Sequence, residues 1–181
     1  RSTSPGYPYI KSRPWKEKGK SYLFEEYLVD GMSNIRPKKY LQNRIDSRLA
    51  KAKENIIPGD SIWIDVLKDE KLKLKKIYDC NTRLFSVGPL DHLILCKQYF
   101  GAFSQFFHAT HDYHFGSPGI NPQSMDWHVQ YEYLTKFGTQ GGDGDVVCWD
   151  GKIPAILTLC AGYIINDWYK KNDPNWTPLD D

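Results

Sequence analysis

The amino-acid sequence predicts a mixed α+β fold, and three observations lead to that prediction. Apolar residues recur at helical spacing between residues 41 and 52, short apolar runs bounded by turn residues are typical of strands, and residues 146–164 indicate a strand, a turn and a helix in succession. The chain has 181 residues, of which 40% are hydrophobic and 14% aromatic. This composition is sufficient for a domain with a buried core and excludes a chain that is disordered throughout.

A helix is expected from Pro37 to about Glu54. Proline suits the first position of a helix, because its missing N–H leaves no intrahelical hydrogen bond unmade there. The apolar stripe that follows at helical spacing consists of Leu41, Ile45, Leu49 and Ala52.

A pair of strands is expected after this helix. Pro58-Gly59-Asp60 predicts a turn, and the run from Ile62 to Val66 is typical of a strand. Residues 71–75 alternate lysine and leucine with the period of an extended chain, which would place three lysines on one face. Asp79-Cys80-Asn81 predicts a second turn, and residues 82–87 a return strand.

The second half of the chain is expected to be mainly helical. Residues 90–107 are apolar enough for a largely buried helix, and another helix is expected between a cap at Ser124 and an end near Gly138. The run at residues 146–149 is typical of a buried strand, and Pro154 can begin the next helix. The apolar stretch of that helix is too short to span a bilayer, so a buried helix is predicted.

Charge is divided unevenly along the chain. Residues 1–100 hold 20 lysines and arginines against 12 acids, whereas residues 101–181 hold 4 against 10, so one half carries +8 and the other −6. A basic half suits a polyanionic partner and an acidic half suits bound cations, although ordinary solvated surfaces carry such charges too. The four cysteines form no CxxC pair, which favours reduced thiols.

Two acids flank the predicted strand at residues 146–149. Asp145 opens the strand, and Asp150 follows it beside Gly151. An acid at the head of a buried strand is costly unless it binds a cation or is fully hydrogen-bonded, and nucleotidyl transfer needs such acids to hold divalent metals. A continuous strand would place the two acids on opposite faces, so only a bend at Asp150-Gly151 brings them to one cleft. Two solvent-exposed acids are the alternative.

Basic residues gather on the predicted hairpin. Lys68, Lys76 and Arg83, with the lysines between them, can hold a triphosphate, since lysine offers a point charge and arginine a bidentate fork. A lysine-rich edge strand that resists aggregation is the alternative.

The N-terminal loop offers groups that can follow a single nucleic-acid strand. Its hydroxyls, amides and aromatic rings suit hydrogen bonding and stacking, although most loops of this composition are ordinary turns. The candidate residues are Thr3, Ser4, Gly6, Tyr7 and Pro8.

Taken in order, these pieces resemble the RNA-dependent RNA polymerases of picornaviruses and their insect-virus relatives. The order is Thr3-Ser4-x-Gly6-Tyr7-Pro8, Lys68-Asp69-Glu70, Thr82-Arg83 and Asp145-x4-Asp150-Gly151. The intervening sequences at residues 85–91, 98–103 and 119–122, the last followed by Trp127, are similar to that family as well. The resemblance covers essentially the whole chain.

The resemblance implies the fingers subdomain of a right-hand polymerase over residues 1–140 and the start of the palm, with its first strand and helix, over residues 141–181. It implies that the N-terminal loop contacts template RNA and that Arg83 grips the incoming triphosphate, with Lys68 and Lys76 in the same basic hairpin. Asn81 departs from the family, which often has a lysine there, so one triphosphate contact is not carried over.

The resemblance also implies the metal chemistry. Asp145 matches the first palm carboxylate, a ligand of the two catalytic metals, Mg²⁺ or Mn²⁺. Asp150 matches the acid that helps to recognise the ribose 2′-OH. Because the later palm motifs and the thumb are absent from this sequence, we expect the chain alone to be inactive, and to be aggregation-prone or stable only in its fingers part.

The implied partners are single-stranded RNA template, nascent RNA, NTPs and the remaining palm and thumb of a parent polyprotein. No transmembrane segment is expected in this chain, and the implied location is the host cytoplasm at membrane-associated replication complexes. A non-enzymatic single-stranded RNA-binding module built on the basic half is the main alternative. A protein-interaction fragment without an RNA role is a third.

Overall fold

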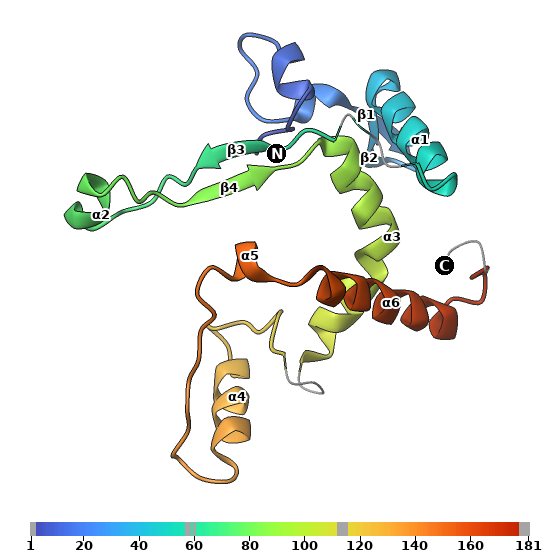
Figure 1. The fold of residues 1–181 in the computed structure, drawn as a ribbon. Coiled ribbons are helices and arrows are strands. Elements are labelled where there is room, and N and C mark those ends of the chain that lie inside the picture. The colour runs from blue at the N-terminus through green and yellow to red at the C-terminus, as the bar shows by residue number, and fades with distance from the viewer. Residues whose placement is uncertain (1–2, 57–58, 60, 112–115, 178–181) are drawn as a thin grey trace. The chain divides into compact units, whose positions relative to one another are not determined.

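A computed structural model describes residues 3–56, 59, 61–111 and 116–177. Its contacts divide the chain into two compact units, Arg1–Tyr99 and Phe100–Asp181 (Figure 1). The described elements are small sheets and helices, which confirms the mixed α+β class. The predicted subdomain boundary at residue 140 stays a prediction, because these units reflect packing within the chain and not polymerase subdomains.

The first unit contains both sheets of the described chain. Its elements in order are η1 (Tyr9–Ser12), η2 (Ser21–Leu23), β1 (Phe24–Val29), β2 (Met32–Pro37), α1 (Lys39–Lys53), β3 (Ile64–Leu67), α2 (Leu74–Tyr78), β4 (Leu84–Val87) and α3 (Leu90–Ala109), where η marks a 3-10 helix. Helix α3 continues into the second unit, which also holds α4 (Asp126–Thr135), α5 (Trp149–Lys152) and α6 (Ala155–Asn172).

Strands β1 and β2 form an antiparallel hairpin that the sequence analysis did not predict. Their register runs from Phe24 opposite Pro37 to Val29 opposite Met32. Asp30 and Gly31 connect them, both with positive φ (51° and 77°), as the tightest hairpin turns require. The predicted helix at residues 37–54 is confirmed as α1, but it begins at Lys39 because Pro37 closes β2.

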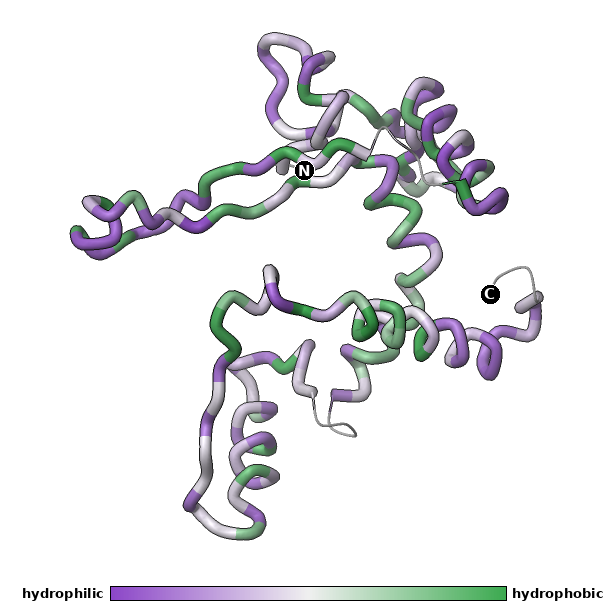
Figure 2. Tube along the Cα trace, in the orientation of Figure 1, coloured by the Kyte–Doolittle hydropathy of each residue, from purple (hydrophilic) through white to green (hydrophobic). Residues whose placement is uncertain are grey.

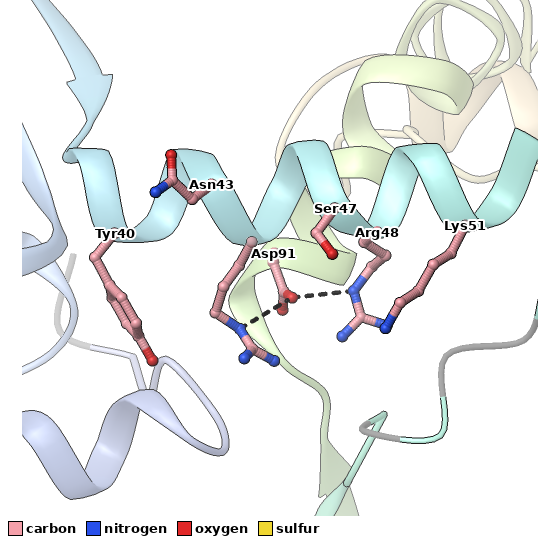
Figure 3. A pocket seen from close by; sticks show the side chains of 7 residues that line it. Tyr40, Asn43, Ser47, Arg48, Lys51 and Asp91 are labelled. Carbon is pink, nitrogen blue, oxygen red and sulfur yellow. Dashed lines mark hydrogen bonds and ion pairs between the residues drawn. The ribbon is translucent and has the colours of Figure 1, made fainter.

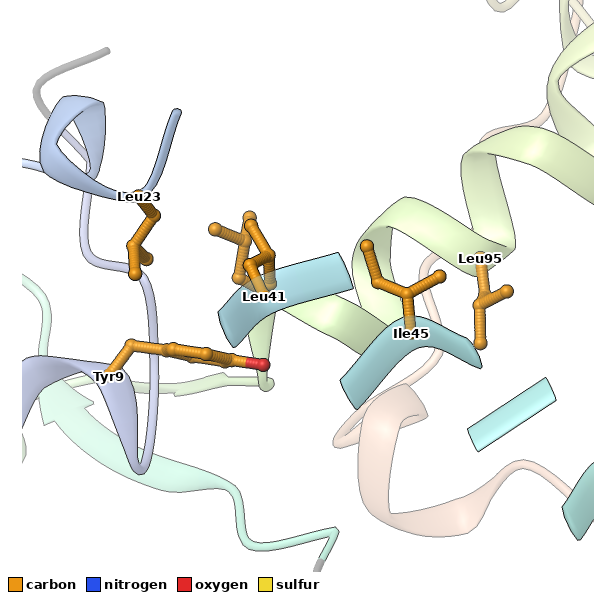
Figure 4. Close-up of a cluster of buried hydrophobic side chains, with 6 residues drawn as sticks. Tyr9, Leu23, Leu41, Ile45 and Leu95 are labelled. Atoms are coloured by element: carbon orange, nitrogen blue, oxygen red, sulfur yellow. The ribbon is translucent and has the colours of Figure 1, made fainter. Parts of the chain in front are cut away.

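The core of the first unit lies against α1 (Figure 4). Its fully packed members are Tyr9, Leu23, Leu41, Ile45, Leu90 and Leu95. The predicted stripe on α1 therefore faces the core at Leu41, Ile45 and, in part, Leu49, whereas Ala52 is exposed. Burial of each aliphatic core member contributes about 1.5–3 kcal/mol. Burial also raises the pKa of the Tyr9 hydroxyl well above its usual value, and the nearby Asp91 adds to that rise, so the hydroxyl stays neutral.

A buried ion pair joins α1 to the start of α3. The Nε of Arg48 lies 3.0 Å from the Oδ2 of Asp91, and the Nε of Arg44 lies 3.6 Å from the same oxygen (Figure 3). Arg48 also donates a hydrogen bond of 2.5 Å from its Nη1 to Ser61 Oγ. Because Arg48 and Asp91 are 6% and 1% exposed, loss of Asp91 would leave the buried charge of Arg48 without its acid, at a cost of about 3–5 kcal/mol.

The predicted strand pair is confirmed as the antiparallel hairpin β3–β4, in which Ile64 lies opposite Val87 and Leu67 opposite Leu84. The extended conformation expected for residues 71–75 is wrong from Leu74 onward, where the short helix α2 begins, whereas Lys73 has extended backbone. The ladder has ended by that point, so the backbone finds its hydrogen bonds locally, for example from the N–H of Lys76 to the carbonyl of Lys73 (2.9 Å).

Two further turn predictions have different outcomes. The turn at residues 79–81 is confirmed, since Asp79 and Cys80 follow α2 in a turn and Cys80 has a φ of 50°. The turn at residues 58–60 falls partly on Pro58 and Asp60, which lie outside the described residues.

The predicted helices of the second half all form, but their burial is not as expected. In α3, which confirms the helix predicted at residues 90–107, only Leu90, Asp91 and Leu95 are buried. Helix α6 begins after Pro154 as predicted, yet none of its described side chains is buried. Figure 2 colours its first half hydrophobic and its second half hydrophilic, so the apolar residues gather at one end of the helix.

Helix α4 confirms a helix between Ser124 and Gly138, but the cap predicted at Ser124 is wrong, because the N-cap residue is Met125. The Ser124 hydroxyl accepts a hydrogen bond of 3.1 Å from the Asp126 N–H, and Gly138 follows the helix with a φ of 139°. The Asn121 N–H donates to the Asp126 carboxylate (3.0 Å), and this bond is the main cause that lowers the pKa of Asp126, with the Ser124 side chain as the second cause.

The strand predicted at residues 146–149 does not form, and that prediction is wrong. Val146 has no regular structure, Val147 and Cys148 lie in a turn, and Trp149 begins α5. Within the described part of the second unit no other strand is available to supply ladder hydrogen bonds, and an isolated strand cannot satisfy its own backbone. Cys148 adopts the left-handed conformation (φ 56°), which breaks the extended run.

The second unit is held by an aromatic cluster. Phe103 and Phe106 of α3 contact Trp168 of α6 at ring-centre distances of 5.6 and 5.2 Å, and the Phe103 N–H donates to the Tyr169 hydroxyl (3.3 Å). The contacts join the C-terminal parts of α3 and α6 and leave the apolar start of α6 outside the cluster.

All four cysteines are free thiols, as predicted. Cys80, Cys148 and Cys160 are exposed, whereas Cys96 is partly buried and burial raises the pKa of its thiol. Within the described residues, no helix is both long and apolar enough to cross a membrane.

Candidate triphosphate and template sites

The hairpin β3–β4 brings Lys68 and Arg83 side by side. The Lys68 N–H donates to the Arg83 carbonyl (2.8 Å), just beyond the last paired residues of the ladder. The carboxylate of Glu70 lies between the two side chains, with Oε2 3.1 Å from the Lys68 Nζ and Oε1 3.5 Å from the Arg83 Nε. One acid therefore holds together two cations that are far apart in the sequence.

The exposure of this cluster suits a ligand that arrives from solvent. The side chains of Lys68 and Arg83 are 41% and 63% exposed, whereas that of Glu70 is only 22% exposed. Lys76 is also exposed and lies on α2, but none of the described ion pairs joins it to Glu70. Two of the three predicted triphosphate ligands thus meet, and the third lies further along the hairpin.

The N-terminal loop is fastened to the segment between β4 and α3. The Leu90 N–H donates to the Pro5 carbonyl (3.1 Å), and the Gly6 N–H donates to the Ser4 hydroxyl (3.2 Å). Gly6 has a φ of 72°, and a Cβ there would lie 2.2 Å from the Gly88 carbonyl oxygen, so only glycine allows this approach. Thr3 and Ser4 remain exposed.

Gly88 and Trp63 lie behind this loop, and the sequence analysis did not identify either as part of the site. A Cβ on Gly88 would lie 2.9 Å from the Trp63 ring, and that ring meets His92 edge-on at 5.8 Å between centres. Gly6 thus packs against Gly88, and Gly88 packs against the Trp63 ring. The Gly88-Pro89 pair after β4 was the available signal, since glycine in such a place often marks a close approach of two backbones.

The two predicted acids belong to the second unit. Asp145 is exposed, in a segment without regular structure, and Asp150 lies in α5. A hard carboxylate oxygen is the ligand type that Mg²⁺ or Mn²⁺ prefers, and Mg²⁺ often takes only one or two protein carboxylates, so Asp145 fits as one ligand. The described residues hold no cluster of three or more histidines, cysteines or acids that would bind a metal by themselves.

The chain matches known viral proteins along nearly its whole length. A model of the family described as viral RNA-dependent RNA polymerase matches residues 1–179. The genome polyprotein of Rice tungro spherical virus (strain A) is 37% identical over 179 residues, 96% of this chain. The replicase polyprotein of Acute bee paralysis virus is 29% identical across 97% of the chain, and the genome polyprotein of Human hepatitis A virus (genotype IB) is 29% identical across 91%.

Those relatives are far longer than this chain, which spans 5%, 9% and 7% of their lengths, respectively. The Sicinivirus 3Dpol RNA-dependent RNA polymerase has a similar fold, with a TM-score of 0.57 and 22% identity over 74% of this chain and 25% of that one. The family match and the fold agree with the motifs set out above, and the chain belongs to the viral RNA-dependent RNA polymerase family.

Proposed function

We propose that this chain supplies the template path and the triphosphate grip of an enzyme that copies viral RNA by two-metal nucleotidyl transfer. The observation that carries the proposal is the pairing of Lys68 with Arg83 at the end of the β3–β4 ladder. Two exposed cations held at fixed spacing match the charge of a triphosphate, and the arginine can bind it through two N–H donors.

The template side of the proposal rests on the N-terminal loop. Its exposed Thr3 and Ser4 face solvent, while Gly6 anchors the loop by close packing. A loop that is fixed at one end and polar at the other suits contacts to the RNA backbone, and Tyr7 adds a ring for stacking. Pro8 directs the chain into η1.

Asp145 is proposed as a ligand of the catalytic metals. Two such ions, when bound, stabilise the attacking and leaving oxygens of the displacement. Asp145 would hold one of them through its carboxylate, Arg83 and Lys68 would neutralise the triphosphate, and Asp150 would recognise the ribose 2′-OH. The chain alone would lack activity, and the complete enzyme would work with the remaining palm and thumb, in the host cytoplasm at membrane-associated replication complexes.

Single-nucleotide incorporation by the parent polymerase tests this proposal. Asp145→Ala should cost roughly 4 kcal/mol of transition-state stabilisation, about a thousand-fold in kcat/KM, because one metal ligand is lost. Arg83→Ala should raise the KM for NTPs about tenfold or more, since it removes a charged, bidentate contact. Asp150→Ala should relax the preference for NTPs over dNTPs without weakening template binding.

Matched controls come from the same units. Asp143→Ala removes an exposed acid near Asp145, and Arg36→Ala removes an exposed arginine that is likewise paired with a glutamate, Glu25. Both should leave incorporation within about twofold. Near-normal elongation by the Asp145→Ala enzyme would remove the metal-ligand assignment.

One observation favours the alternative of a non-enzymatic RNA-binding module, namely the net positive charge of residues 1–100. It predicts RNA affinity that falls with salt at a log–log slope of about −0.7 for each phosphate contacted, and no incorporation by any form of the parent protein. A protein-interaction fragment would show no such salt dependence. The incorporation assay therefore separates the enzyme from the other two functions, and the salt dependence of RNA binding separates those two from each other.

A further inference from the structure

Trp15 is 96% exposed, in the loop between η1 and η2. A large indole ring is rarely left in water without a reason, because burying it would be favourable. The segment around it, residues 11–20, holds five lysines and arginines and a single acid, Glu17, for a net charge of +4. An isolated aromatic ring among cations is the composition that binds single-stranded nucleic acid.

This loop is continuous with the proposed template loop. The Ile10 N–H donates to the Gly6 carbonyl (2.9 Å), and the Lys11 N–H donates to the Pro8 carbonyl (3.0 Å). The Lys11 ammonium also lies 5.0 Å from the centre of the Tyr7 ring. These contacts connect residues 3–8 to the basic segment by ordered chain.

Trp15 itself is carried by a turn. The Glu17 N–H donates to the Pro14 carbonyl (3.0 Å), and Pro14 fixes the backbone just before the ring. The ring is therefore presented by a short, constrained segment, which lowers the entropy lost when a ligand stacks on it.

We propose that Trp15 and the cations of residues 11–20 bind an unpaired stretch of template RNA next to the stretch contacted by residues 3–8, with the indole stacked on one base. An anionic membrane surface also suits tryptophan and lysine, but continuity with the template loop favours RNA. The inference rests on the proposed function, because it extends the template path of that function.

The experiment uses the parent polymerase and three primer–template RNAs. One has a short 5′ template overhang, one a long overhang, and one a long overhang that is abasic throughout. Trp15→Ala should weaken binding of the long overhang at least about fivefold, the lower limit for loss of one stacked base. Binding of the short and the abasic overhangs should not change, because neither offers a base to Trp15.

Two further variants separate stacking from charge. Trp15→Phe should keep most of the affinity for the long overhang, since a smaller ring still stacks. Lys16→Gln combined with Lys18→Gln should weaken the long and the abasic overhangs alike, because phosphates remain in both. Trp15 is almost fully exposed, so loss of folding is not expected from its replacement, and a melting curve checks this.

Equal binding of the long overhang by Trp15→Ala and the unchanged enzyme would overturn the inference, as would an equal loss on the abasic overhang. Weaker binding to phosphatidylcholine vesicles that contain phosphatidylserine, with RNA binding unchanged, would assign Trp15 to a membrane surface instead. Failure of the parent protein to bind the short-overhang RNA would count against the proposed function itself. Normal short-overhang binding with no effect of Trp15 would count against this inference alone.

Discussion

Glu70 gives the basic end of the β3–β4 hairpin its geometry. Its carboxylate reaches Lys68 at 3.1 Å and Arg83 at 3.5 Å, but the side chains of both cations are open to solvent, partly for Lys68 and mostly for Arg83. Ion pairs of this kind contribute only about 0–1 kcal/mol to stability, because solvent screens them. The role that fits the geometry is to hold two cations at the spacing that a triphosphate needs.

The Glu70→Gln variant tests this role in the parent polymerase. The variant removes the charge that neutralises the two cations and loosens their spacing, so kcat should fall about tenfold while the KM for NTPs does not rise. Single-nucleotide incorporation across a range of NTP concentrations separates the two constants. Asp69→Asn, a change at the neighbouring exposed acid, serves as the control and should leave both constants within about twofold. A raised KM with normal kcat would mean that Glu70 contributes to binding and not to positioning.

At the residue scale, sequence reasoning identified the cations but not what arranges them. Lys68 and Arg83 were predicted as partners because a hairpin was expected between them, and the ladder confirms that neighbourhood. The bridging position of Glu70 depends on side-chain directions beyond the end of the ladder. No period or spacing in the sequence encodes those directions.

At the element scale, local signals worked where the chain supplies both partners of a contact. Strands β3 and β4 form as predicted because each has its partner within this sequence. The strand at residues 146–149 was wrong because apolar character alone cannot supply a neighbouring strand. The hairpin β1–β2 was predictable, because an Asp-Gly pair between two strand sequences, here Asp30-Gly31, is the strongest short-range hairpin signal.

Two glycines allow a test of the packed template loop. Gly6 and Gly31 both have positive φ, 72° and 77°, but only Gly6 touches another backbone. Gly31→Ala should cost about 1–2 kcal/mol from backbone strain alone. Gly6→Ala should cost at least about 2 kcal/mol more, because its Cβ meets the Gly88 carbonyl at 2.2 Å.

Urea denaturation of the parent polymerase measures this difference. Template affinity provides a second readout, since Gly6→Ala should weaken RNA binding and Gly31→Ala should not. Equal destabilisation by the two variants would show that the close approach of Gly6 to Gly88 does not affect the free energy of unfolding.

At the scale of the whole molecule, burial is concentrated in one unit. All the buried core residues lie within Arg1–Tyr99, and among the described residues of Phe100–Asp181 none is buried. The sequence predicted the helices of the second unit but not their exposure. Apolar content shows that a helix face prefers burial, but it does not show what will cover it.

Hydrogen exchange of the 181-residue chain tests this asymmetry. Amides of α1 should exchange at least about tenfold more slowly than those of α4 and α6, because opening of a helix without a buried face costs little free energy. Mass spectrometry of peptides from each unit gives the comparison in one sample. Equal protection in both units would contradict the prediction and indicate a core in the second unit.

The free thiols give this chain natural attachment points for probes. Cys80 lies just after α2 in the hairpin, Cys148 lies between the two proposed acids, and both are exposed. Cys96 should react slowly, because burial raises the pKa of its thiol, and Cys160→Ser removes the remaining exposed site. Spin labels on Cys80 and Cys148 would then report the distance between the basic hairpin and the segment that holds Asp145 and Asp150, before and after nucleotide is added.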